Sequence, residues 1–379
     1  MIPKISPFEI HVPEADLDDL KSRLARTRWT DRETVDDWSQ GAPLAKIQSL
    51  ITHWRDAYDW RRCEAMLNGF GSSRAQFDDL GIHFLHVKSP HPNALPLLLT
   101  HGWPGSVVEF AGVIGPLTDP VAHGGRAEDA FDVVVPALPG YGFSDKPTRT
   151  GWNAARIAEA WIGLMRALGY KRWVAQGGDW GSVVTHCIAG LAPPECAAVH
   201  FNMVPLPPGT TKTPDPTPQE QAALEAMAKH RREGAGYSTQ QSSKPQTLGY
   251  GLVDSPVAQA AWVYEKFHAW SDCGGDPESV FTHDQLLDNI MLYWLPAAGT
   301  SSGRLYWEKS VRGERGKVQI PVGVSIFPGE IFSPSRRWAE AGLANIVYWN
   351  EVERGGHFAA FEQPALFVGE MRACFRQIR

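Results

Sequence analysis

Asp179 lies at the centre of the sequence GGDWGS (177–182), between an apolar run and a helical stretch. This pattern is typical of a nucleophile elbow, G-x-Nu-x-G, in which small residues two before and two after the nucleophile leave room for a tight turn. An aspartate at the central position can attack carbon directly and form an alkyl ester. The alternative is an ordinary glycine-rich turn in which Asp179 caps the helix. Ser182 lies beyond the elbow, in the first turn of the predicted helix, which disfavours it as a nucleophile.

A second motif, HGWPGS (101–106), follows the apolar run LPLLLT (95–100). Its position matches the loop that supplies an oxyanion-hole N–H group to a nucleophile elbow. We therefore expect the backbone N–H groups of Trp103 and Trp180 to hold a negatively charged oxygen between them. Pro104 has no N–H group and stiffens the loop. Taken alone the motif is also compatible with a simple turn, and it gains weight from its pairing with the elbow.

A base, and an acid that orients it, are expected near the end of the chain. His357 lies in the glycine-flanked loop RGGHF (354–358), and Glu330 follows the preceding predicted strand. The order Asp179, Glu330, His357 is that of nucleophile, acid and base in elbow-type hydrolases. We expect Glu330 to fix the tautomer of His357 while His357 takes a proton from water.

The composition excludes several classes of protein. The 379 residues include 36 Lys and Arg against 42 Asp and Glu, a net charge of −6, which disfavours a nucleic-acid partner. The five scattered cysteines form no C-x-x-C pair, and His83 and His86, three apart in a predicted strand, point to opposite faces, so no metal site is indicated. There is neither a signal peptide nor a run of the ~20 apolar residues that a spanning helix needs. We therefore expect a soluble, cytoplasmic protein without a membrane anchor.

Apolar runs and amphipathic stretches alternate through most of the chain, and this alternation predicts an α/β fold with a mostly parallel sheet. The predicted strands are 82–87, 95–100, 131–135, 172–175, 198–204, 322–327 and 346–349. Helices are predicted at 154–168 and 182–191. Short runs that are apolar throughout are typical of strands buried on both faces of a parallel sheet.

Two segments depart from this alternation. Residues 1–80 are expected to be mostly helical, with amphipathic runs at 16–28 and 43–67. Residues 205–315 open with a proline-rich loop and continue with predicted helices at 219–232, 257–270 and 284–294, so we expect a helical cap there. The α/β core would then comprise 81–204 and 316–379. A cap over the carboxyl ends of parallel strands lies where open α/β sheets bind ligands.

The motifs GGDWGS, HGWPGS and RGGHFAAFEQP resemble those of the microsomal-type epoxide hydrolases, which include the juvenile-hormone epoxide hydrolases. The sequence IHVPEADLDDLKSRLARTRW also resembles that family's N-terminal domain, and the likeness covers essentially the whole chain. The resemblance implies an α/β-hydrolase fold and hydrolysis of epoxides to vicinal diols through a covalent aspartyl ester, with no metal or organic cofactor. It also implies that Tyr237 and Tyr306 donate hydrogen bonds to the epoxide oxygen, and that the N-terminal helices brace the cap.

Three other activities are weighed against this expectation. A haloalkane dehalogenase also uses an elbow aspartate, and Trp103 and Trp180 are candidate halide ligands, but such an enzyme has no use for paired phenols. An esterase would need serine or cysteine at the elbow. A non-catalytic protein that binds an apolar ligand would have no reason to keep Asp179, Glu330 and His357 together. We therefore expect a small apolar epoxide and water as substrates, and the sequence leaves a homodimer open.

Overall fold

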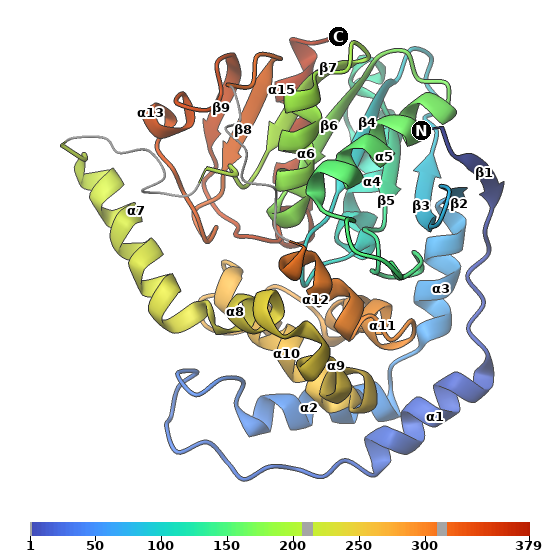
Figure 1. Cartoon of the computed structure of the whole chain (residues 1–379), viewed down its shortest axis with the longest axis vertical. Helices are drawn as coiled ribbons and strands as arrows, with labels where there is room; N and C mark the ends of the chain where they lie inside the picture. Colours follow the sequence, from blue (N-terminus) through green and yellow to red (C-terminus); the bar gives the residue numbers. More distant parts are fainter. Residues whose placement is uncertain (1, 207–214, 309–316) are drawn as a thin grey trace.

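A computed structural model describes residues 2–206, 215–308 and 317–379 (Figure 1). Within these ranges nine strands form one sheet, in the order β1-β2-β3-β5-β4-β6-β7-β8-β9. They are β1 (Lys4–Pro7), β2 (Ser72–Gln76), β3 (Gly81–Val87), β4 (Leu95–Thr100), β5 (Phe131–Pro136), β6 (Trp173–Gly177), β7 (Cys196–Phe201), β8 (Val322–Ile326) and β9 (Ile346–Glu351). Neighbours from β5 to β9 are parallel, and those from β1 to β5 are antiparallel. The prediction of a mostly parallel sheet is confirmed.

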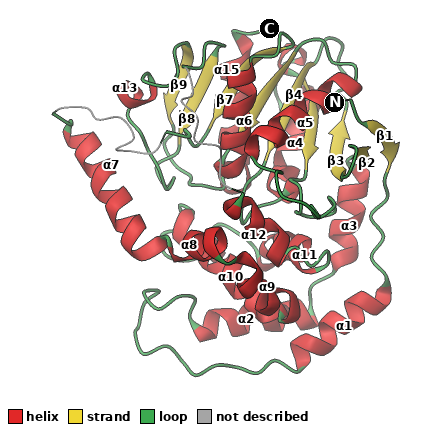
Figure 2. Cartoon of the chain, in the orientation of Figure 1, coloured by secondary structure: helices red, strands yellow, loops and turns green. Residues whose placement is uncertain are grey.

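Helices cover the central strands, and Figure 2 shows the strands gathered in one layer above an all-helical part of the molecule. Helices α4 (Ala111–Thr118) and α15 (Pro364–Arg376) pack as one pair, and α5 (Ala154–Ala167) and α6 (Asp179–Leu191) pack as another. Every residue of β4 is buried. A strand of this kind must be apolar throughout, which makes it easy to predict. All seven predicted strands are present, with ends displaced by at most three residues, although β9 is only half-buried.

The N-terminal segment contains two strands that the sequence did not predict. β1 and β2 extend the sheet at its antiparallel edge, but their sequences KISP and SSRAQ are short and largely polar and give no strand signal. The helices of this segment are α1 (Glu14–Ala25), α2 (Leu44–Asp56) and α3 (Trp60–Gly69). The single run expected at 43–67 is wrong, because Asp59 accepts a hydrogen bond from the backbone N–H of Arg61 (2.9 Å) and begins a separate helix.

The segment between β7 and β8 is helical in the part that the structure describes. Its helices are α7 (Pro218–Lys229), α8 (Gly236–Ser243), α9 (Pro245–Asp254), α10 (Pro256–Trp270), α11 (His283–Trp294) and α12 (Gly299–Trp307). Three of them, α8, α9 and α12, were not predicted. The end of the expected cap at residue 315 and much of the proline-rich loop lie outside the described residues, so the division at 80, 204 and 315 stays a prediction. Figure 1 places these helices next to the sheet, at the end where β6 passes into α6.

Shorter elements complete the described chain. They are α13 (Arg336–Ala339), α14 (Ala359–Glu362), a π-helical turn at His230–Gly234, and 3₁₀ turns at Val107–Phe110, Val121–His123, Ala127–Asp129 and Pro277–Ser279. None of the helices in the described ranges is long and apolar enough to cross a membrane.

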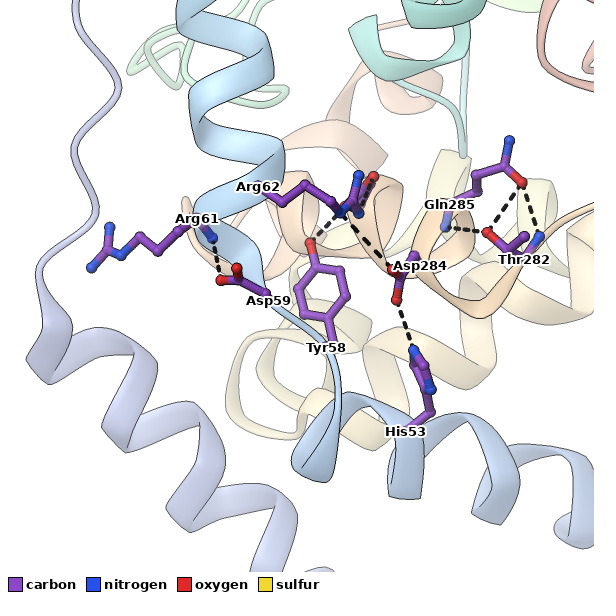
Figure 3. Close-up of polar contacts among 9 residues, drawn as sticks. His53, Tyr58, Asp59, Arg61, Arg62, Thr282, Asp284 and Gln285 are labelled. Carbon is purple, nitrogen blue, oxygen red and sulfur yellow. Dashed lines mark hydrogen bonds and ion pairs between the residues drawn. The ribbon is translucent and has the colours of Figure 1, made fainter.

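Polar contacts join the N-terminal helices to α11 (Figure 3). The hydroxyl of Tyr58 donates to Oδ1 of Asp288 (2.8 Å), and the guanidinium of Arg62 donates to both oxygens of the same carboxylate (2.7 and 2.8 Å). One turn earlier on α11, Asp284 contacts Nε2 of His53 at 2.7 Å. The Asp288 side chain is 7% exposed and that of Asp284 is 43% exposed. The N-terminal segment therefore holds α11 through a buried carboxylate and an exposed one.

Replacing the buried carboxylate should cost far more stability than replacing the exposed one. We expect Asp288→Ala to lower the free energy of unfolding by about 2–3 kcal/mol, because it leaves the Tyr58 hydroxyl and Arg62 without their acceptor. The matched control Asp284→Ala should cost less than about 1 kcal/mol, since exposed ion pairs contribute little. Urea denaturation of both variants measures the difference, and equal losses would contradict this account of the contact.

Candidate active site

Asp179 lies at a strained turn between β6 and α6. Its φ is +49°, in the left-handed region that residues with a side chain rarely occupy. A Cβ at position 177 would come within 2.2 Å of the carbonyl oxygen of Gly181, and a Cβ at position 181 within 1.9 Å of that of Thr100. Both glycines are therefore required by close backbone contacts. Gly178, and not Asp179, is the N-cap of α6, so the structure favours the elbow over a simple capping turn.

The Asp179 carboxylate faces His357, which in turn contacts Glu330. Nε2 of His357 lies 3.7 Å from Oδ2 of Asp179, and Nδ1 of His357 lies 2.7 Å from Oε1 of Glu330. Because an ionised carboxylate only accepts hydrogen bonds, Nδ1–H donates to Glu330, and Nε2 is left facing Asp179. The three side chains are 15%, 3% and 1% exposed for Asp179, His357 and Glu330. The structure thus brings together the three residues that chain order had paired.

The charges in this group are coupled. Burial by itself would lower the pKa of His357, but the negative charges of Glu330 and Asp179 and the hydrogen bond to Glu330 raise it to about 9. Burial raises the pKa of Asp179, while the charge of His357 and the backbone N–H groups of Trp103 and Trp180 oppose that rise. At neutral pH we therefore expect an imidazolium facing a carboxylate.

Backbone N–H groups hold the carboxylate of Asp179. The N–H of Trp103 donates to Oδ1 of Asp179 at 2.8 Å, and the N–H of Trp180 also interacts with this carboxylate. A Cβ at Gly102 would lie 2.2 Å from Oδ1, so only glycine lets the HGWPGS loop approach so closely. With Oδ1 held here, Oδ2 is the oxygen that remains available for reaction.

His101 fixes the shape of the same loop, a role that sequence reasoning missed. Burial lowers its pKa to about 4, so the imidazole is neutral. Nε2 accepts a hydrogen bond from the N–H of Leu138 (3.2 Å), which leaves the proton on Nδ1 to donate to the carbonyl oxygen of Gly102 (2.9 Å). The neutral ring thereby ties the loop to the segment after β5.

Tyr237 of α8 and Tyr306 of α12 form an aromatic cluster with the tryptophans of the two motifs. The ring of Tyr237 stacks on that of Trp103, with centroids 4.9 Å apart and planes at 7°. Tyr306 packs edge-on against Trp180 at 5.0 Å, and the two tyrosine rings are 5.8 Å apart. Trp270 of α10 contacts Tyr237 at 5.1 Å. The cluster is therefore apolar except for its phenol hydroxyls, which supply hydrogen-bond donors.

Both phenols stay protonated at neutral pH. Burial raises the pKa of Tyr237 and of Tyr306, and the negative charge of Asp179 raises both further. The buried hydroxyl of Tyr306 interacts with the hydroxyl of Tyr237 and with Trp180, yet no group within the described ranges meets it with hydrogen-bond geometry. An unpaired buried donor costs about 1–3 kcal/mol, which is a reason to regard this hydroxyl as reserved for a ligand. Among the other cap tyrosines, Tyr264 donates to Glu278 and Tyr250 is exposed.

α11 clamps the HGWPGS loop from the cap side. Nδ2 of Asn289 donates to the carbonyl oxygen of Pro104 (2.8 Å), and its Oδ1 accepts from the hydroxyl of Ser106 (2.6 Å). The hydroxyl of Tyr293 donates to the carbonyl oxygen of Gly105 (2.7 Å). These partners lie more than 180 positions apart in the sequence, and no local pattern signals them.

The loop that carries His357 is held in a comparable way. The N–H of His357 donates to the carbonyl oxygen of Trp270 (2.9 Å), and Oδ2 of Asp272 accepts from the N–H of Gly355 (2.9 Å). Glu362 accepts from the N–H groups of Asp272 (2.8 Å) and Phe358 (2.9 Å). Sequence reasoning missed both acids, although RGGHFAAFE contains Glu362 within the motif itself.

Metal ligands do not cluster anywhere in the described ranges: no group of three or more His, Cys, Asp or Glu side chains there could hold a metal ion. The two strand histidines have other partners. Nε2 of His83 contacts the hydroxyl of Ser72 (2.9 Å), and Nε2 of His86 contacts that of Tyr170 (2.8 Å).

An aspartate at a nucleophile elbow of a mostly parallel sheet, with a histidine and an acid beyond the last strands, defines a hydrolase of the α/β-hydrolase fold. Residues 96–229 match the model of that fold, and residues 5–110 match the model of the epoxide hydrolase N terminus. A putative epoxide hydrolase from Stigmatella aurantiaca is 58% identical over 99% of this chain and 86% of the relative. The chain belongs to the epoxide hydrolase family, and it is an enzyme of that family.

Further relatives extend this comparison. Epoxide hydrolase 1 of Sus scrofa is 34% identical over 97% of this chain and 88% of its own length. The crystal structure of juvenile hormone epoxide hydrolase from Bombyx mori has a TM-score of 0.89 and 30% identity, covering 100% of this chain and 95% of that one. Aspergillus niger epoxide hydrolase has a TM-score of 0.88 and 30% identity, covering 100% and 97%. The predicted fold and family are thus confirmed.

The approach of Gly102 to the nucleophile should be indispensable for activity. In Gly102→Ala the new Cβ would overlap Oδ1 of Asp179, so the loop must retreat and weaken the hydrogen bond from Trp103. We expect epoxide turnover to fall at least about a hundredfold, as on loss of an oxyanion-hole donor. Steady-state kinetics on styrene oxide, with thermal unfolding as a check on folding, measure this loss. Normal turnover by a folded variant would contradict it.

Proposed function

We propose that this protein opens small apolar epoxides to vicinal diols through a covalent ester on Asp179. The proposal is supported by two buried, protonated phenols, Tyr237 and Tyr306, which pack against Trp103 and Trp180 and whose pKa values are raised by the charge of the elbow aspartate. The hydroxyl of Tyr306 has no hydrogen-bond partner among the described residues. A phenol can assist the opening of a strained ring by donating to its oxygen. The apolar walls of Trp103, Trp180 and their neighbours favour a small apolar substrate.

In the first step, Oδ2 of Asp179 attacks one epoxide carbon, and the bond between that carbon and the ring oxygen breaks. The oxygen is hydrogen-bonded by Tyr237 and Tyr306 and becomes a hydroxyl by taking a proton from one phenol. Oδ1 stays on the N–H of Trp103 as the carbonyl oxygen of the ester. The orientation of substrate between phenols and carboxylate supplies the proximity that the attack requires.

Esterification removes the charge of Asp179, so the imidazolium of His357 loses its extra proton to solvent and the neutral ring becomes the base. In the second step, water adds to the carbonyl carbon of the Asp179 ester and gives a proton to Nε2 of His357. The N–H groups of Trp103 and Trp180 stabilise the oxyanion at Oδ1, while Glu330 stabilises the imidazolium. When the bond between the carbonyl carbon and the alkoxy oxygen breaks, His357 returns the proton to the leaving oxygen and the diol departs. The new carboxylic acid ionises, and its proton restores the phenol through water.

Removing the base should trap the ester. We expect His357→Gln to form the Asp179 adduct but to hydrolyse it at least about a hundredfold more slowly than the wild-type protein. Peptide mass spectrometry after mixing with styrene oxide should then find the added mass on the peptide that contains Asp179. The control Asp179→Asn should give no early adduct and no diol.

Two outcomes would overturn the proposal. Diol production by Asp179→Ala at a normal rate would exclude the ester. Release of bromide from a brominated alkane, without opening of styrene oxide, would identify a haloalkane dehalogenase instead.

The two steps should respond differently to pH. In the free protein the negative charge of Asp179 helps to hold the pKa of His357 near 9, but esterification removes that charge and leaves that of Glu330. The pKa of His357 in the ester is therefore lower, and hydrolysis, which needs neutral His357, should rise with pH and level off below pH 9. Quenched-flow measurements between about pH 5 and pH 9 should find most ester at the acidic end. A hydrolysis rate that does not change with pH would contradict the assignment of His357 as the base.

A further inference from the structure

A water-sized cavity adjoins Asp179, and Trp103 of the aromatic cluster lines it as well. Its volume is about 20 Å³, and Asp179, His357 and Glu109 line it, whereas Tyr237 and Tyr306 do not. A space of this size holds about one water molecule. The cavity thus reaches Asp179 without contacting either phenol.

Two residues that line this cavity carry polar atoms without protein partners. They are Thr100 and Gln176, whose Oγ1 and Oε1 atoms are buried without a hydrogen-bond partner among the residues that the structure describes. Buried polar atoms are rarely left unpaired in proteins, and ordered water commonly satisfies them. The chemistry of the cavity wall therefore favours water over an apolar occupant.

The carboxyl group of Glu109 is placed at this cavity by the HGWPGS loop. Glu109 lies in the 3₁₀ turn Val107–Phe110, and its side chain folds back over Gly105, where a Cβ would come within 1.3 Å of Oε1. Burial raises the pKa of Glu109 to about 8, against the opposing charge of His357. At neutral pH the group is therefore mostly a neutral acid, which can both donate and accept a hydrogen bond.

We propose that Glu109 and His357 together hold the water that hydrolyses the Asp179 ester, which makes Glu109 a catalytic residue of the second step. This inference rests on the proposed function. The water oxygen bonds to the carbonyl carbon, one of its protons passes to Nε2 of His357, and its remaining O–H stays hydrogen-bonded to Glu109. Glu109 neither gains nor loses a proton over the step, and its contribution is the orientation of the attacking lone pair.

The position of the cavity fits this role. Oδ1 of Asp179 is bound to the N–H of Trp103, and in the proposed mechanism the alkyl group of the ester lies on the side of the two phenols. Water must therefore reach the carbonyl carbon from a third direction. The cavity is bounded by Asp179 and His357, so a water held there meets both the carbon that it attacks and the base that accepts its proton.

The test is to measure the two half-reactions separately in Glu109→Gln and Glu109→Ala. Rapid quenching after mixing with styrene oxide gives the rate of ester formation and the rate of ester hydrolysis. We expect ester formation to stay within about threefold of wild type, and hydrolysis by Glu109→Ala to fall at least about tenfold, so that ester accumulates. Glu109→Gln keeps a group that can both donate and accept, and should lose less. The matched control Glu370→Gln changes another buried carboxylate, bonded to Ser325, Tyr348 and Asn350, and should alter neither rate.

Each result has a distinct meaning. If the wild-type protein forms no ester, the proposed function itself fails. If the ester forms and both Glu109 variants hydrolyse it at the normal rate, the role of Glu109 fails. If both half-reactions slow equally in the Glu109 variants, Glu109 only supports the HGWPGS loop, and the inference is overturned.

Discussion

The whole site depends on bringing a buried carboxylate into contact with backbone N–H groups and an imidazole at the same time. Asp179 can accept the N–H of Trp103 at 2.8 Å only because Gly102 has no side chain. The left-handed turn at Asp179 also depends on Gly177 and Gly181, because at both positions the neighbouring backbone is too close for a side chain. This geometry also sets the protonation of His357, because the negative charge of the buried Asp179 carboxylate raises the pKa of the imidazole beside it. In the proposed mechanism, esterification removes this charge and thereby makes His357 available as a base, so the first reaction prepares the second.

The N-terminal segment and the cap support the same geometry from a distance. Arg62 and Tyr58 bind Asp288 on α11, and the next residue, Asn289, binds the carbonyl oxygen of Pro104 in the loop that holds the nucleophile. One helix thus connects the N-terminal segment to the N–H groups around Asp179. This continuity explains physically why a segment that carries none of the proposed catalytic residues packs against the cap.

The sequence predicted the parts of the site that obey a strict local rule. Tight turns restrict residue types severely, so the glycines around Asp179 and the loop containing Trp103 could be recognised, and chain order then pointed to His357. Strands buried on both faces were predictable for the same reason. Tyr237 and Tyr306 came from resemblance alone, and Glu109, Asn289 and Glu362 were missed. Single polar residues in apolar helices or turns carry no periodic signal, and their partners become neighbours only in the folded chain. The strands β1 and β2 were missed for another reason: they lie at the edge of the sheet, where a strand does not need apolar residues.

The origin of the oxygen in the first diol tests most directly whether Asp179 forms an ester. With the protein in excess over styrene oxide in ¹⁸O-labelled water, a single turnover should give diol that contains only ordinary oxygen. The peptide that carries Asp179 should gain one heavy oxygen in the same experiment, because water attacks the carbonyl carbon and not the substrate. Heavy oxygen in the first diol, with an unlabelled Asp179 peptide, would mean that water attacks the epoxide directly and would contradict the covalent mechanism.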